Sequence, residues 1–150
     1  MKRDEIIKRL KKYFKITELV CPHVYEKYGN ASWRFLTTES LYTLLVLRED
    51  ILQVPLICNN YSIGLTQRGL RCNLCELIKE KTKNDELSLT AHGGGKGWDL
   101  TSPKMTADEM RRKISQKSHL LPYPIRIEKD VDWLHIDNYD AGNSQKITYF

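Results

Sequence analysis

The chain of 150 residues has no apolar run long enough to cross a membrane, which takes about 20 residues. Basic residues near the N-terminus resemble the start of a secretory signal peptide. However, Ile6-Ile7 is followed at once by Lys8-Arg9, so the apolar core of such a signal is missing. These absences argue against a membrane-inserted or secreted protein. We expect a chain that is cytoplasmic as synthesised unless another protein releases it.

The chain also lacks internal repeats, low-complexity tracts and domain linkers. Its 41% hydrophobic and 29% charged residues are typical of a folded globular protein and exclude wholesale disorder. One domain over residues 1–150 is therefore predicted, with a helical part at about 1–53 and a second part at about 54–139 that carries the motifs described below. The net charge of +5 suits an anionic polymer, nucleic acid or bacterial cell wall, without choosing between them.

Hydrophobic periodicity and end signals predict the secondary structure. A short helix is expected near residue 17, ending at Pro22, and Thr106 with Glu109 forms a capping box that begins a helix reaching Gln116. Further helices are expected over residues 3–14, 37–52 and 71–83, the last with Leu74, Leu77 and Ile78 facing inward. Strands are expected over residues 54–59, 87–91, 98–101, 125–128, 133–139 and 147–150, with those at 125–128 and 133–139 forming a hairpin over the turn at Lys129-Asp130. This order predicts an α+β fold, a small antiparallel sheet flanked by helices.

A glycine-rich turn separates His92 from Asp99. The glycines at 93, 94, 95 and 97 permit a tight turn that brings the two side chains together, because glycine tolerates positive φ and close backbone approach. Alone, the segment could equally be a flexible loop with an incidental histidine and aspartate. It is not a phosphate-binding P-loop, because it lacks the Lys-Ser/Thr ending and is followed by a predicted strand.

A second segment, Asp132 to Asp137, supplies another imidazole. Strand alternation puts Trp133, His135 and Asp137 on one face. Two imidazoles and one carboxylate, with a fourth position open, are the ligand set of a catalytic zinc site. Asp132 is a candidate general base for water at such a site, and Asp137 either shares that candidacy or orients His135.

Together the two segments resemble the signature of the zinc D-alanyl-D-alanine carboxypeptidases and L-alanyl-D-glutamate endopeptidases of the hedgehog/DD-peptidase superfamily, which includes phage endolysins. That signature is Ser-x-His-x-x-Gly-x-Ala-x-Asp, followed by Glu/Asp-x-x-His on a strand that contains tryptophan. This chain reads Thr90-x-His92-x-x-Gly95-x-Gly97-x-Asp99 and then Asp132-Trp133-x-His135. It departs from the pattern in having Thr90 for serine, Gly97 for alanine, and Asp132 where many members have glutamate.

The resemblance covers about residues 55–139 and implies a hedgehog/DD-peptidase-like fold. It implies His92, Asp99 and His135 as zinc ligands and Asp132 as the catalytic acid/base.

The family also has a Gly-Tyr-Arg segment upstream whose arginine contacts the substrate. Gly69-Leu70-Arg71 stands in the corresponding place, so Arg71 is the candidate for binding a substrate carboxylate. Arg68 is the second candidate, with a solvated loop charge as the alternative interpretation.

The cysteines pose a separate question. Cys21-x-His23 and Cys72-x-x-Cys75 together offer three thiols and an imidazole, a structural zinc set if they meet in space. The first spacing is tighter than in zinc fingers, and Cys72 and Cys75 fall on a predicted helix. We therefore favour buried small side chains for these cysteines, with a second zinc as the alternative. Cys58 is expected in the core.

The function that the resemblance implies is a zinc-dependent peptidase hydrolysing peptidoglycan stem peptides, as in a phage or prophage lysis enzyme. Its partner is peptidoglycan or its stem peptides, reached during lysis, without membrane insertion or nucleic acid. The bond cut, in a D-Ala-containing or an L-Ala-D-Glu peptide, stays open. One alternative is a non-catalytic, metal-binding cell-wall recognition module. Another is a basic, zinc-containing nucleic-acid-binding phage protein.

Overall fold

The helical part of the molecule is built around α3 (Thr38–Val46), as the computed structural model of residues 1–150 shows. Thr37 caps this helix by accepting a hydrogen bond from the Ser40 amide. A π-helical turn, Leu47–Ile51, continues it. The helix α1 (Arg3–Leu10) packs against α3, burying Ile6 and Leu10 completely. The predicted helices over 3–14 and 37–52 are therefore confirmed, the first ending earlier.

Proline begins a helix where the sequence suggested an end. A single 3₁₀ turn, Ile16–Glu18, replaces the short helix expected near residue 17, and α2 (Pro22–Tyr28) starts at Pro22. Proline is favourable at a first helical position because its missing N–H would have no partner there in any case. A 3₁₀ helix, Gly29–Phe35, then leads to α3.

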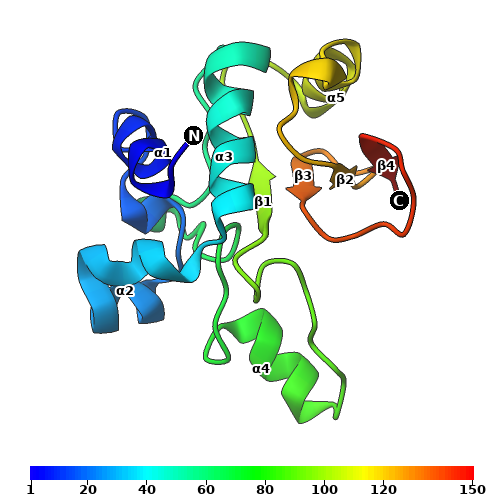
Figure 1. Cartoon of the computed structure of the whole chain (residues 1–150). Coiled ribbons are helices and arrows are strands. Elements are labelled where there is room, and N and C mark those ends of the chain that lie inside the picture. Colours follow the sequence, from blue (N-terminus) through cyan, green and yellow to red (C-terminus); the bar gives the residue numbers. More distant parts are fainter.

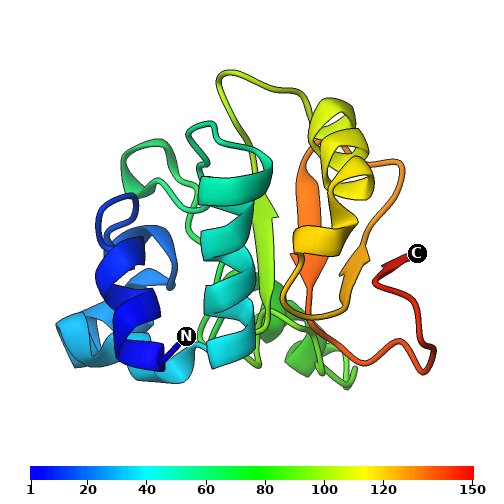
Figure 2. The ribbon, with the colours of Figure 1, turned by 45° about the horizontal axis from the view of Figure 1, so that its top comes forward.

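Four short strands form one mixed sheet in the order β1-β3-β2-β4. β1 (Gly97–Leu100) and β2 (Ile125–Ile127) both pair antiparallel with the central β3 (Leu134–Asp137). β4 (Ile147–Tyr149) pairs parallel with β2 at the edge. The predicted α+β class and the hairpin are confirmed, with the last strand parallel to its neighbour. In Figures 1 and 2, α3 lies between α1 and the sheet, beside β1.

The helix α5 (Ala107–Gln116) covers the hairpin and begins as predicted, with Thr106 and Glu109 forming the reciprocal capping box. Its Met110 and Ile114 are buried, and the helix contacts β3. Arg111, also buried, donates hydrogen bonds to the carbonyls of Glu128, Val131 and Trp133. The turn that leads into β3 is therefore fixed to α5 by one side chain.

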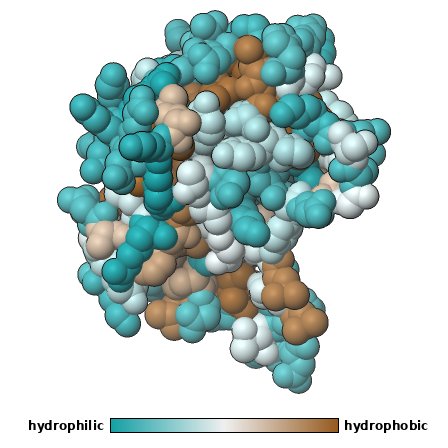
Figure 3. Space-filling model, viewed as in Figure 1, coloured by the Kyte–Doolittle hydropathy of each residue, from teal (hydrophilic) through white to brown (hydrophobic).

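The region between α3 and β1 differs most from expectation. The helix α4 (Glu76–Lys83) begins later than residue 71, and Leu74 and Leu77 are 49% and 45% exposed instead of buried. No strand forms over residues 87–91, and residues 54–59 make only one bridge, between Ile57 and Thr101. In Figure 1, α4 projects from the rest of the fold, and the same region shows exposed apolar surface in Figure 3.

One cluster of 30 buried apolar residues runs from α1 through α3 into the sheet, so the chain has a single core. None of the helices has the length and apolar character that a membrane span requires.

Candidate metal centre

Three potential metal ligands meet where β1 and β3 pair. Asp99 on β1 is the register partner of His135 on β3, so their side chains share one face of the sheet. His92 reaches the same place from the turn before β1. Asp99 Oδ1 lies 2.7 Å from His135 Nδ1, and Asp99 Oδ2 lies 3.3 Å from His92 Nε2. All three side chains are buried, and their ligand atoms lie within 4.8 Å of one another. The structure thus brings the predicted zinc ligands together; we call them the His-Asp-His triad.

The glycines of the motif are required by close packing. Gly95 has a φ of +65°, and a Cβ there would lie 2.2 Å from the Phe35 carbonyl oxygen. A Cβ at Gly97 would lie 2.9 Å from the Cβ of Ala91. The turn therefore packs tightly against the chain before α3, which fixes His92 instead of leaving it on a flexible loop.

A backbone acceptor selects the tautomer of His92. Its Nδ1 lies 2.9 Å from the carbonyl oxygen of Gly69. Because a carbonyl oxygen only accepts, Nδ1 must carry a hydrogen, so Nε2 is the nitrogen that faces Asp99 and the centre of the triad and would bind a metal through its lone pair.

A carboxylate fixes which ring nitrogen of His135 faces the triad. Its Nε2 lies 3.0 Å from Asp137 Oδ2, which leaves Nδ1 facing Asp99. Asp137 is itself held by two hydrogen bonds from Arg126, at 2.9 and 2.8 Å, and by the Tyr139 amide. Its side chain has no exposed surface. Both oxygens of Asp137 are occupied, so its role is to orient His135, and it is poorly placed to act as a base.

The site concentrates negative charge around His135. Burial lowers the pKa of His135, but hydrogen bonds to Asp137 and Asp99 outweigh it and raise that pKa to about 9. Burial raises the pKa of Asp99, yet hydrogen bonds from His135 and His92 hold it well below its usual range. The pKa of Asp137 falls to about 2, because hydrogen bonds from His135 and Arg126 outweigh its burial. Without a metal, the triad therefore holds a proton that a cation can displace.

Both candidate substrate-binding arginines lie beside the triad. Arg71 makes an ion pair with Asp99 at 3.2 Å and donates a hydrogen bond to the Gln67 carbonyl, and its side chain is 15% exposed. Arg68, Arg71, Asp99 and Trp133 are among the residues that line a hollow of about 240 Å³. A larger hollow, of about 600 Å³, also includes Arg71, together with the motif turn. Arg71 thus lines both hollows and contacts the triad through its ion pair with Asp99.

The structure places Asp132 apart from the triad. Its side chain is exposed and lines a separate hollow of about 320 Å³ with Thr101, Ser102 and Asp108. It is not among the groups that converge with His92, Asp99 and His135. A catalytic role for Asp132 remains a prediction.

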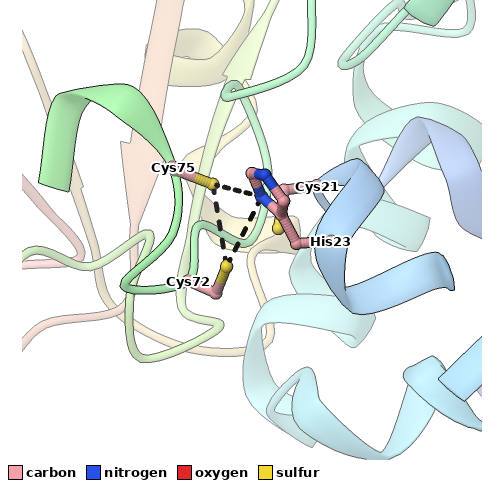
Figure 4. Close-up of side chains that lie close together, drawn as sticks. All are labelled: Cys21, His23, Cys72 and Cys75. Atoms are coloured by element: carbon pink, nitrogen blue, oxygen red, sulfur yellow. Dashed lines mark hydrogen bonds between the residues drawn. The ribbon is translucent and has the colours of Figure 1, made fainter. Parts of the chain in front are cut away.

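A second group of potential metal ligands lies elsewhere in the chain. Figure 4 shows its members, which we call the Cys3His cluster: Cys21, His23, Cys72 and Cys75. Cys72 and Cys75 lie in the turn before α4 and not within a helix, contrary to expectation. Cys58 is fully buried in the core, as predicted.

The donor set of the triad fits zinc. Two imidazole nitrogens and one carboxylate oxygen converge from three places in the chain, which is the protein ligand count of a catalytic zinc site whose fourth position is taken by water or substrate. The sequence reasoning missed two supporting groups, the Gly69 carbonyl and Arg126. Arg126 could have been predicted from the sequence, because it is the register partner of Asp137 in the predicted hairpin.

Comparison with protein-family models, curated proteins and solved structures found no match to this chain.

Proposed function

We propose that the protein is a zinc-dependent peptidase that hydrolyses peptidoglycan stem peptides, as a phage or prophage lysis enzyme does. The observation that best supports a metal site is the orientation of the two imidazoles. The Gly69 carbonyl and Asp137 each hold one ring nitrogen, so that the other nitrogen of each ring faces Asp99. The peptide substrate class comes from the motif resemblance and from the place of Arg71.

The triad, Arg71 and Asp132 have different proposed roles in hydrolysis. His92, Asp99 and His135 would hold a zinc ion, and the chemistry that the ion would supply is Lewis acidity toward a peptide carbonyl and toward water. Arg71, which lines both hollows, binds a carboxylate of the stem peptide and sets the register of the scissile bond. Asp132 is exposed on the turn that enters β3, and we propose that its side chain swings toward the triad when substrate binds and accepts a proton from the attacking water. It then delivers that proton to the amine nitrogen as the C–N bond breaks.

A muropeptide digest tests this function. Purified muropeptides are incubated with the zinc-loaded protein and with His135→Ala, and the products are identified by mass spectrometry. The control is His119→Ala, which removes an exposed histidine far from β3 in the sequence. We expect cleavage by the wild type and the control, with the product masses naming the bond, and none by His135→Ala. No cleavage by a wild type shown to contain zinc would contradict the proposal.

One observation favours a second candidate, a metal-binding cell-wall recognition module without turnover. The only proposed acid/base, Asp132, is exposed and lies outside the triad. This candidate predicts that the protein sediments with purified cell walls, that chelation abolishes sedimentation, and that no peptide is released.

A further inference from the structure

The geometry of the Cys3His cluster is that of a tetrahedral metal site. His23 Nδ1 lies 3.7 Å from Cys72 Sγ and 3.8 Å from Cys75 Sγ, and the two sulfurs are 4.0 Å apart. Cys21 completes the group within 4.8 Å. With Zn–S near 2.3 Å and Zn–N near 2.0–2.1 Å, tetrahedral geometry separates ligand atoms by about 3.5–3.8 Å. His23, Cys72 and Cys75 are therefore close to this spacing, and Cys21 lies near enough to complete the set with a small shift.

The alternative roles of these side chains fit less well. The 4.0 Å between the sulfurs of Cys72 and Cys75 is about twice the S–S distance of a disulfide. Simple burial does not account for His23, an exposed residue whose ring nitrogen nevertheless faces two sulfurs. The Leu74 amide also donates to Cys72 Sγ at 3.4 Å, the kind of outer hydrogen bond that supports a thiolate ligand.

The cluster lies where two distant segments of the chain meet. The Cys21 amide donates to the Leu70 carbonyl at 3.0 Å, and the Leu70 amide donates to the Leu19 carbonyl at 2.9 Å. A Cβ at Gly69 would lie 2.2 Å from the Leu19 carbonyl oxygen, so only glycine permits this approach. Cys21 is part of this contact, and Cys72 lies two residues after Leu70 on the other segment.

The segment beyond this contact has little else to hold it. In α4 only Ile78 packs against the core, and it is partly buried, while Leu87 and Leu89 after the helix are 87% and 77% exposed. A region without its own core needs another source of order, and a structural metal is a common one. The same segment carries Arg71, next to Cys72, and the Gly69 carbonyl that orients His92.

We propose that the Cys3His cluster binds a structural zinc ion, which fastens the segment carrying Arg71 to the start of α2. This site is separate from the triad, and its existence does not depend on peptidase activity.

Cobalt substitution tests the proposal on the intact protein. Thiolate ligands give Co²⁺ a ligand-to-metal charge-transfer absorption in the near ultraviolet, which the sulfur-free triad cannot produce. We expect this band in the wild type and in the double variant His92→Ala/His135→Ala, and its loss in Cys72→Ser/Cys75→Ser. Cys58→Ala removes the one cysteine outside the cluster and should keep the band.

Zinc content gives the second readout. We expect two zinc ions per chain in the wild type and one in His92→Ala/His135→Ala. Absence of the thiolate band from folded, cobalt-loaded wild-type protein would overturn the proposal even if the cysteine variants fail to fold. A Cys72–Cys75 disulfide in protein purified without zinc at the cluster would also overturn it. Loss of muropeptide cleavage with the cobalt band retained would count against the peptidase and leave the structural site standing.

Discussion

At the scale of single residues, the candidate centre depends on the groups behind the ligands. Asp137 connects Arg126 to His135, and the Gly69 carbonyl plays the corresponding part for His92. Such partners fix the ring orientation and increase the basicity of the nitrogen that faces the metal.

Removing the charge behind His135 should weaken metal binding. In Asp137→Asn the side chain keeps its size but loses the carboxylate that accepts from Nε2. We expect zinc affinity at the triad to fall by roughly 10–100-fold, measured by competition with a chromophoric chelator in the Cys72→Ser/Cys75→Ser background. Asp140→Asn, at an exposed aspartate nearby, is the control and should bind as the parent does. Equal affinity in Asp137→Asn and the parent would show that Asp137 is not the orienting group.

The raised pKa of His135 predicts a pH dependence of the metal-free protein. The folded protein holds the proton up to about pH 9, whereas an ordinary histidine loses it near 6.5. The resulting stability is therefore complete below pH 6.5 and is lost as pH rises through 9, a change on the order of 3 kcal/mol. Urea unfolding of chelator-treated protein should show this decline relative to His135→Gln. A difference between the two proteins that does not change from pH 6 to pH 9.5 would contradict the assignment.

At the scale of elements, the motif turn before β1 aligns His92 with the sheet. Gly95 and Gly142 both have positive φ, +65° and +68°, but a Cβ at Gly142 meets nothing within 4 Å. Gly142→Ala should therefore cost only the backbone strain, about 1–2 kcal/mol. In Gly95→Ala the new Cβ also collides with the Phe35 carbonyl oxygen. We therefore expect a larger loss in the free energy of unfolding, measured by chemical denaturation, and less zinc bound at the triad. An equal loss in the free energy of unfolding for the two variants would contradict the close packing of Gly95 against Phe35.

The dependence of α4 on the Cys3His cluster predicts a local response to metal removal. Because α4 has no buried residue, chelation should increase amide hydrogen exchange over residues 70–90. The helix α5, anchored by buried Met110 and Ile114, should stay protected. Hydrogen–deuterium exchange with mass spectrometry measures both regions in one experiment. A uniform increase, or none, would contradict the fastening role.

Elements with a strong local signal could be predicted from the sequence. The capping box at Thr106, the hairpin of β2 and β3, and the start of α3 after Thr37 all follow from residues close together in the chain. The strand expected over 87–91 was wrong because the alternation of Leu87 and Leu89 resembles a strand, yet no neighbouring strand is there to pair with it. Local pattern does not reveal whether a partner exists.

At the scale of the whole molecule, the two metal-ligand groups differed in how predictable they were. The triad could be predicted because its ligands stand at the positions of a motif, and sheet register then brings Asp99 and His135 together. The Cys3His cluster joins residues about 50 positions apart, and the helical pattern around Leu77 obscured the turn that holds Cys72 and Cys75. Only the packing of Leu70 against the start of α2 brings them together.

Locating the bound metals in a crystal tests the central claim most directly. Anomalous difference maps from zinc-loaded crystals, recorded above and below the zinc absorption edge, identify both the element and its position. We predict one zinc peak among His92, Asp99 and His135 and a second within the Cys3His cluster. An ordered triad without a zinc peak, in crystals grown with zinc in excess, would contradict the assignment of a zinc centre and the peptidase function built on it.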